Sequence, residues 1–274
     1  MGALLDRASP LGFIPLAFIP ARKLKTHMAI RASGGLLENL KTILFAGLIA
    51  VGIRTVAFEP FNIPSGSMIP TLEIGDYLFV SKYSYGYSRY SLPFSPPLFA
   101  GRIFNSLPKR GDVAVFKYPG DNRTDYIKRI VGLPGDTIRV TKGILFVNGQ
   151  AVPRIAGPPR ESRDDSGILV RGLRFTETLP GGAKYNIQKF SDDGFPNNTN
   201  DFAVPAGRIF VMGDNRDASS DSRLPNSGVG FVPLENLVGR AEFIFFSIES
   251  TSPWWQFWMW PFEIRWKRLF SGIN

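Results

Sequence analysis

The stretch Ile63–Leu72 reads IPSGSMIPTL, and its two serines flank a single glycine. A proline stands near each end, and a proline disfavours helical backbone at the residue before it. We therefore predict a rigid, extended loop that presents the Ser67 hydroxyl away from its own backbone. Taken alone, the loop has two interpretations: Ser67 is a nucleophile, or the segment is a connector that leaves a membrane helix.

The composition restricts how Ser67 could be activated. The 274-residue chain has no cysteine, which excludes a cysteine nucleophile, a disulfide and a thiolate metal site. Its single histidine, His27, precedes an apolar segment. If that segment separates His27 from Ser67 across a bilayer, a Ser-His-Asp triad and a histidine-rich zinc site are both excluded. The sequence thus indicates no metal and no cofactor, and Ser67 needs another base.

The charge distribution favours a lipid surface over nucleic acid as a partner. The net charge is +9, but the basic residues are scattered apart from two clusters near the ends of the chain. No basic face is interleaved with aromatic residues, so we expect no nucleic-acid binding. A basic protein beside anionic lipid is the better interpretation.

The apolar segment 42–58 reads TILFAGLIAVGIRTVAF and is predicted to be a transmembrane anchor. It is near the lower limit of the roughly 20 residues that a span needs, and Arg54 is close enough to one end to reach the headgroups. A buried helix of a soluble core and a cleaved secretory signal are the alternatives. The excess of Lys and Arg in residues 1–41 predicts a cytoplasmic N-terminal tail, with residues 59–274 outside the cytoplasm.

Residues 59–274 are predicted to form a strand-rich body, since 28 glycines and 22 prolines favour many turns. Asn148-Gly149 is a typical hairpin turn, and residues 153–205, rich in Gly, Asp, Asn and Arg, are predicted to be an inserted smaller β lobe. The expected strands are Tyr77–Val80, Val113–Phe116, Tyr126–Val131, Thr137–Val140, Ile144–Val147, Ile209–Met212 and Ala241–Ile248.

The stretch Trp254–Trp260, WWQFWMW, contains four of the five tryptophans and is followed by three basic residues. This pattern predicts a patch at the membrane interface that contacts lipid. Ordinary core aromatics are the alternative, although seven consecutive residues cannot all face one core.

Lys128 is the candidate base for Ser67. It lies in the stretch Asp125–Asp136, DYIKRIVGLPGD. A lysine amine accepts a proton only when it is neutral, a form that burial favours. Strand alternation places Lys128 on one face with Tyr126 and Ile130. The alternative is an ordinary strand lysine with its amine in solvent.

The stretch Gly213–Arg223, GDNRDASSDSR, is the third candidate for chemistry. Its acidic spacing is similar to that of a calcium loop, but the glycine and closing glutamate of such a loop are missing, and Arg216 and Arg223 supply counter-charges. We predict a salt-bridged turn in which the hydroxyl of Ser219 or Ser220 orients the lysine amine.

Together these three stretches resemble the bacterial type I signal peptidases, which are membrane-bound Ser/Lys endopeptidases. The resemblance covers most of residues 55–248 and includes the stretch Arg110–Val113 in order. It implies a mainly β fold of coiled antiparallel sheets, preceded by one N-terminal transmembrane helix. The site would then lie on the periplasmic or outer face of the bacterial inner (plasma) membrane. The best-known members have two spans, whereas this chain has one predicted span.

The resemblance also implies roles for individual residues. Ser67 would be the nucleophile and Lys128 the general base, Ser65 and the Ser67 backbone N–H would form the oxyanion hole, and Ser219 would orient the lysine. Asp221 and Arg223 would form a supporting ion pair. The pockets for small substrate side chains would be lined by Ile63, Pro64, Met68, Leu72, Tyr126 and Ile127.

The reaction implied is removal of signal peptides from secreted preproteins, by cleavage after small residues of the Ala-x-Ala type. Two rival functions remain open at this point. One is a related Ser/Lys peptidase that processes a narrower set of substrates, and the other is a membrane-anchored binding module without catalytic activity.

Overall fold

The computed structural model describes residues 35–92, 95–163, 166–193, 196–225, 227–249 and 255–273. His27, most of the predicted tail 1–41 and Trp254 lie outside these ranges. The chain divides into two compact units, residues 1–45 and 46–274, and the strands belong to the second.

The helix α1, Leu36–Val56, contains most of the apolar segment and has exposed apolar side chains along its length. Among the described residues it is the one helix that is long and apolar enough to cross a membrane. It begins at Leu36 rather than Thr42, because three further leucines, at positions 36, 37 and 40, precede the predicted segment. Glu38 in the first turn also stabilises this start, since its negative charge lies near the positive end of the helix dipole. It ends before Phe58, which pairs with Ser81 in a sheet.

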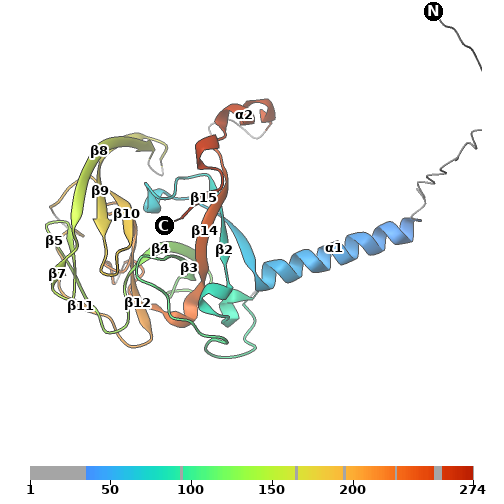
Figure 1. Cartoon of the computed structure of the whole chain (residues 1–274), viewed down its shortest axis with the longest axis horizontal. Helices are drawn as coiled ribbons and strands as arrows, with labels where there is room; N and C mark the ends of the chain where they lie inside the picture. The colour runs from blue at the N-terminus through green and yellow to red at the C-terminus, as the bar shows by residue number, and fades with distance from the viewer. Residues whose placement is uncertain are drawn as a thin grey trace, which may run out of the picture. The chain divides into compact units, whose positions relative to one another are not determined.

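An antiparallel eight-stranded sheet holds the predicted site (Figure 1). Its order is β1-β2-β14-β3-β4-β12-β13, and β15 also pairs with β14. The long strand β14 has register shifts and pairs with β2 and with β3, so it joins the N-terminal strands to β4. The bounds are β1 Phe58–Asn62, β2 Asp76–Ser81, β3 Val113–Lys117, β4 Asp125–Gly132, β12 Arg208–Met212, β13 Val232–Pro233, β14 Leu237–Ser247 and β15 Ser271–Gly272.

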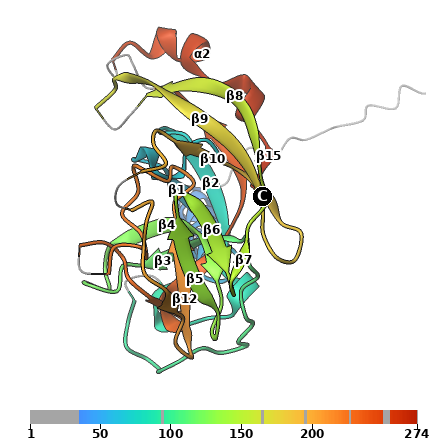
Figure 2. The ribbon, with the colours of Figure 1, turned by 90° about the vertical axis from the view of Figure 1, so that its left-hand side faces the viewer.

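Two smaller sheets complete the strand structure of the described residues, in the orders β11-β5-β6-β7 and β10-β9-β8. In Figure 2 the strands β8 and β9 arch above β4, β5 and β6. The segment 153–205 contributes to both sheets, since β11 pairs with β5, and its separation as a lobe stays a prediction. The bounds are β5 Thr137–Thr141, β6 Ile144–Val147, β7 Gln150–Ala151, β8 Arg154–Arg163, β9 Leu169–Thr178, β10 Lys184–Lys189 and β11 Phe202–Ala203.

The seven strands predicted from the sequence are confirmed, with ends that differ by a few residues at most. The Asn148-Gly149 hairpin is also confirmed: both residues have positive φ, 53° and 77°, as a type I′ turn requires. The remaining helices are short, namely η1 Gly66–Met68, η2 Tyr83–Tyr85, η3 Arg89–Ser91, η4 Leu234–Asn236, η5 Phe257–Met259, α2 Trp260–Glu263 and η6 Trp266–Arg268.

Buried apolar side chains hold the strands of the site together. Met68 and Leu72 are fully buried in a cluster with Leu78 and Val113, which anchors the serine stretch to β2 and β3. Each fully buried side chain of this size contributes about 1.5–3 kcal/mol. Tyr185 of β10 packs in another cluster with residues of β4 and β12, so the three-stranded sheet shares a core with the strands beside the site.

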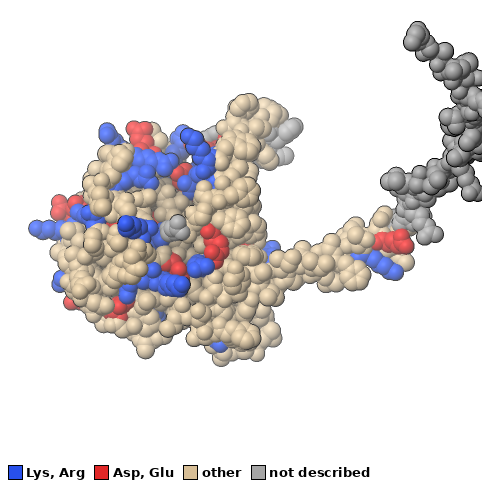
Figure 3. Space-filling view, viewed as in Figure 1, with Lys and Arg blue, Asp and Glu red and all other residues tan. Residues whose placement is uncertain are grey.

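The described tryptophans of the C-terminal stretch are exposed, which contradicts the core alternative for them. Trp255, Trp258 and Trp260 are 55%, 58% and 43% exposed, and Trp266, which follows the stretch, is 63% exposed. In Figure 3 the projection that carries α2 is uncharged on the face shown, whereas charges of both signs cover the region of β8–β10. Contact of this patch with lipid stays a prediction.

Candidate active site

Ser67 and Lys128, which are 61 residues apart in the chain, meet through their side chains. Lys128 Nζ donates a hydrogen bond to Ser67 Oγ at 2.6 Å and another to the Ile127 carbonyl at 3.0 Å. Both side chains are buried, and the amine lies 5.6 Å from the centre of the Tyr126 ring. The structure thus brings together the predicted nucleophile and base in an apolar environment.

The backbone around Ser67 is not extended throughout, which corrects the prediction from the prolines. Gly66–Met68 form a single 3-10 turn, while Ser65 and Ile69 on either side are extended, with ψ of 154° and 134°. The prolines restrict the residues before them, Ile63 and Ile69, and leave the residues between free to turn. The turn directs Ser67 toward β4.

Ser65 lies beside Ser67, the predicted nucleophile. Its Oγ is 3.4 Å from Ser67 Oγ, and the residue is half-buried. This position is compatible with a hydroxyl donor for an oxyanion that forms at Ser67, and the role stays a prediction.

A pocket of about 430 Å³ opens at Ser67 and Lys128. Four of the six predicted pocket residues line it, namely Ile63, Pro64, Tyr126 and Ile127. Met68 and Leu72 do not, because their side chains are fully buried in the core. The lining residues that the sequence analysis missed are Phe61, Asn62, Val115, Asp125 and Ala218. No group of three or more His, Cys, Asp or Glu in the described part of the chain could hold a metal ion.

The two candidate orienting serines lie in different environments. Ser219 is buried, and its Oγ makes no hydrogen bond, so the expected contact with Lys128 is not formed in this structure. Its hydroxyl packs against Gly213, where an added Cβ would lie 2.2 Å from Ser219 Oγ. Ser220 is exposed and lines the pocket. The close contact with Ser219 leaves no room for a side chain at position 213, so only glycine fits there.

The expected ion pair between Asp221 and Arg223 is present and buried. Arg223 Nη2 and Nε donate to the two carboxylate oxygens at 2.8 and 2.9 Å, and the Gly213 N–H donates to the same carboxylate at 3.0 Å. Burial alone would raise the pKa of Asp221, but the charge and hydrogen bonds of Arg223 lower it. The carboxylate therefore stays ionised and holds the turn that begins at Gly213.

A second buried ion pair, between Arg129 and Asp214, was not predicted. Arg129 Nε and Nη2 donate to the two oxygens of Asp214 at 2.8 and 2.7 Å, and Thr71 Oγ1 donates to the same carboxylate at 2.5 Å. Arg129 follows Lys128, Asp214 follows Gly213, and Thr71 lies in the serine stretch. The carboxylate of Asp214 therefore links all three stretches.

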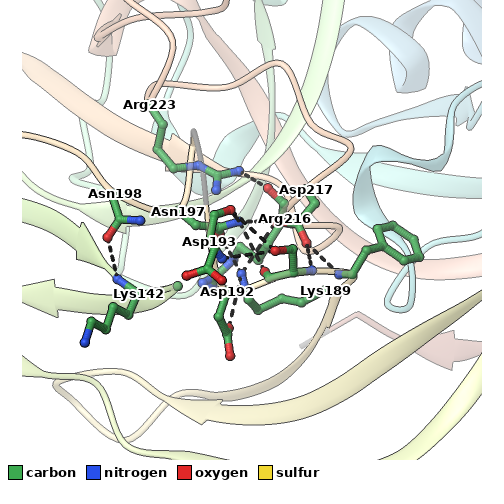
Figure 4. A network of polar contacts seen from close by, with 12 residues as sticks. Lys142, Lys189, Asp192, Asp193, Asn197, Asn198, Arg216, Asp217 and Arg223 are labelled. Atoms are coloured by element: carbon green, nitrogen blue, oxygen red, sulfur yellow. Dashed lines mark hydrogen bonds and ion pairs between the residues drawn. The ribbon is translucent and has the colours of Figure 1, made fainter.

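The arginine expected to balance the acids of the third stretch pairs elsewhere. Arg216 Nη1 donates to Glu177 of β9 at 2.9 Å, and both side chains are buried. The same stretch binds Lys189, at the end of β10, through Asp217 (Figure 4). Burial lowers the pKa of Lys189. These contacts join the 213–223 turn to the three-stranded sheet, and no local pattern indicates them.

Comparison with known proteins identifies the family. The profile described as "Signal peptidase, peptidase S26" matches residues 36–246, a range that includes all three stretches. This chain belongs to the S26 signal peptidase family. The resemblance seen in the sequence is thereby confirmed.

Individual S26 relatives cover most of the chain. Signal peptidase I of Rickettsia canadensis is 44% identical over 227 residues, which cover 80% of this chain and 82% of that protein. Signal peptidase I of Rickettsia typhi is 42% identical over 227 residues, with the same coverage of 80% and 82%. A crystal structure of a signal peptidase I from Enterococcus faecalis V583 is 25% identical and aligns with a TM-score of 0.29, covering 49% of this chain and 97% of that one.

Proposed function

We propose that this S26 family member is a membrane-anchored serine endopeptidase that removes N-terminal signal peptides from secreted preproteins, cleaving after small residues of the Ala-x-Ala type. The observation that carries the proposal is the 2.6 Å contact between Lys128 Nζ and Ser67 Oγ. This contact lies in a pocket of about 430 Å³. Neither cysteine nor a histidine outside the N-terminal tail is available as an alternative nucleophile or base.

The proposed reaction proceeds through an acyl-enzyme. Ser67 Oγ attacks the carbonyl carbon of the scissile bond while neutral Lys128 accepts the hydroxyl proton. The resulting ammonium gives this proton to the amine of the mature chain as the peptide C–N bond breaks. Lys128 then takes a proton from water, whose oxygen attacks the ester carbon. As the bond from this carbon to Ser67 Oγ breaks, the Lys128 ammonium returns its proton to Ser67 Oγ, and the leader leaves as a carboxylic acid that ionises in water.

Two donors near Ser67 would stabilise the oxyanion of the tetrahedral intermediates. These are the Ser65 hydroxyl, which lies 3.4 Å from the nucleophile oxygen, and the Ser67 backbone N–H. In comparable hydrolases one such donor contributes about 3 kcal/mol to catalysis.

The leader would bind as an extended strand between residue Ile63 and strand β4, with backbone hydrogen bonds to both edges. Ile63 and Pro64 line one side of the pocket, and Tyr126 and Ile127 line the other. Because these side chains are apolar and bulky, the space between them favours small substrate side chains such as alanine.

Helix α1 would anchor the enzyme, with the N-terminus in the cytoplasm and the strand-rich unit on the outer face of the membrane. The exposed tryptophans near α2 would contact the same bilayer. We expect a variant with Trp255, Trp258 and Trp266 changed to serine to cleave a membrane-held preprotein in liposomes several-fold more slowly, with unchanged cleavage of a short soluble peptide. Equal losses on both substrates would contradict lipid contact.

The pH dependence of cleavage tests Lys128 as the base. We expect cleavage of a preprotein with an Ala-x-Ala site, by the full-length protein in detergent, to rise from about pH 6 to about pH 10 as one group loses its proton. Only the neutral amine can accept the Ser67 proton, so the sign is an increase with pH. Lys128→Ala should remove cleavage at every pH.

A well-folded sample that cleaves no leader would instead favour a binding module without activity. Cleavage of a single leader out of a panel from different secreted proteins would favour a narrower processing role.

A further inference from the structure

A second hollow, of about 210 Å³, lies next to the pocket at Ser67. It is lined by Ser162, Arg163, Val170, Phe190, Asn215 and Ala218. Ala218 also lines the first pocket, and it is exposed. The two hollows therefore share Ala218, whose side chain is a single methyl group.

Asn215, which lines the second hollow, is hydrogen-bonded to the turn Gly66–Met68 that contains Ser67. The backbone N–H of Asn215 donates to the Ser67 carbonyl at 3.1 Å, and Asn215 Nδ2 donates to the Gly66 carbonyl at 3.1 Å. A residue that lines the second hollow, Asn215, is thus hydrogen-bonded to Ser67 and to the residue before it. Ile63 and Tyr126 line the first pocket and do not line this hollow.

Phe190 forms a preorganised apolar wall. Its ring is 41% exposed, while its backbone N–H donates to Asp217 Oδ2 at 2.5 Å. Asp217 is fixed in turn by Asn197 Nδ2 at 2.8 Å and by buried Lys189 at 3.5 Å (Figure 4). The backbone that carries the Phe190 side chain is therefore held in place at the rim of the hollow.

We propose that this second hollow binds a side chain of the substrate on the mature side of the scissile bond. The inference rests on the proposed function: if the leader lies against Ile63 and Tyr126, the chain beyond the carbonyl attacked by Ser67 continues past Ala218. At about 3.3 Å per extended residue, the first three mature residues span about 10 Å beyond the scissile bond, and these are the positions to be tested.

The lining predicts the preference of this subsite. Val170 and Phe190 provide apolar walls that suit an aliphatic side chain. Arg163 at the rim is paired with Glu249, Nε to Oε1 3.0 Å, so its charge is already balanced. A lysine of the substrate is opposed instead by the apolar walls, which cannot replace the water around its ammonium. The subsite should therefore favour leucine over glycine and discriminate against lysine.

A substrate set with one constant leader and Ala-x-Ala site tests the proposal. Leucine, glycine or lysine is placed in turn at each of the first three mature positions, and kcat/KM is measured with the full-length enzyme in detergent. At one position we expect leucine to exceed glycine by about tenfold, the discrimination typical of a small apolar pocket, and lysine to be the poorest.

Variants then assign the preference to the hollow. Phe190→Ala and Val170→Ala should each bring the leucine-to-glycine ratio at that position toward one. Leu173→Ala is the matched control, because Leu173 is an exposed apolar residue of β9 that lines neither hollow, and its ratio should match that of the unmodified enzyme.

Two kinds of failure are distinguishable. Equal kcat/KM for the leucine, glycine and lysine substrates at all three positions overturns the subsite and leaves the proposed function intact. A preference that survives in both Phe190→Ala and Val170→Ala also overturns it. Failure of the unmodified enzyme to cut even the glycine substrate contradicts the proposed function itself.

Discussion

Ser67→Ala is expected to abolish preprotein cleavage, with kcat reduced by about a millionfold, as in serine hydrolases that lose their nucleophile. Lys128, the proposed base, donates to Ser67 Oγ at 2.6 Å, so Ser67 carries the hydroxyl that is placed to lose its proton in the proposed reaction. The fold should be retained, because the change removes one buried oxygen and leaves the turn and its core contacts in place. Cleavage is measured with purified full-length protein in detergent, and circular dichroism checks the fold.

Ser65→Ala provides the graded comparison for this prediction. It removes one proposed oxyanion donor and leaves the nucleophile, so kcat should fall by about 10²–10³ rather than to background. If Ser67→Ala kept more activity than Ser65→Ala, the assignment of the nucleophile would be wrong.

Asp214→Ala is expected to lower the free energy of unfolding by about 3–5 kcal/mol, the usual effect of leaving one buried partner of an ion pair alone. Arg129 and Asp214 are both 1% exposed at their side chains, so water cannot replace the lost carboxylate. Burial alone would lower the pKa of Arg129, and the carboxylate of Asp214 raises it instead. Asp214→Ala would leave the buried guanidinium of Arg129 without its main counter-charge. Urea unfolding in detergent, followed by far-ultraviolet circular dichroism, measures the loss.

The exposed pair of Arg139 and Asp201 supplies the control. The two side chains are 43% and 60% exposed and 3.7 Å apart, so Asp201→Ala should change the free energy of unfolding by less than about 1 kcal/mol. Losses of equal size in Asp201→Ala and Asp214→Ala would contradict a special contribution from the buried pair.

Several parts of the molecule follow from local sequence. Strands such as Val113–Phe116 and Ile209–Met212 are short apolar runs between turn residues, and short-range preferences are sufficient to specify them. The pairing of Ser67 with Lys128 could also be predicted, because the absence of cysteine and the position of the one histidine leave few bases.

Long-range contacts decided the details of the site. Met68 and Leu72 are as apolar as Ile63, and the choice between core and pocket depends on the 3-10 turn and on strands β2 and β3, which follow in sequence. Ser219 and Ser220 are adjacent, yet one is buried against Gly213 and the other lines the pocket. From sequence alone, neighbouring residues of similar chemistry cannot be assigned to the core or to the pocket, because this depends on the surface that packs against them.

The sequence by itself determined the family, the apolar segment of α1 and most strands of the main sheet, and it predicted that Ser67 and Lys128 meet, because residue type and local pattern are sufficient for each. Tertiary structure alone decided which carboxylate pairs with which arginine, as in Arg129 with Asp214, 85 residues apart. It also decided which side chains line the two hollows. The physical reason is that ion pairs and pockets form between surfaces from distant parts of the chain, whose mutual positions depend on the packing of the whole core.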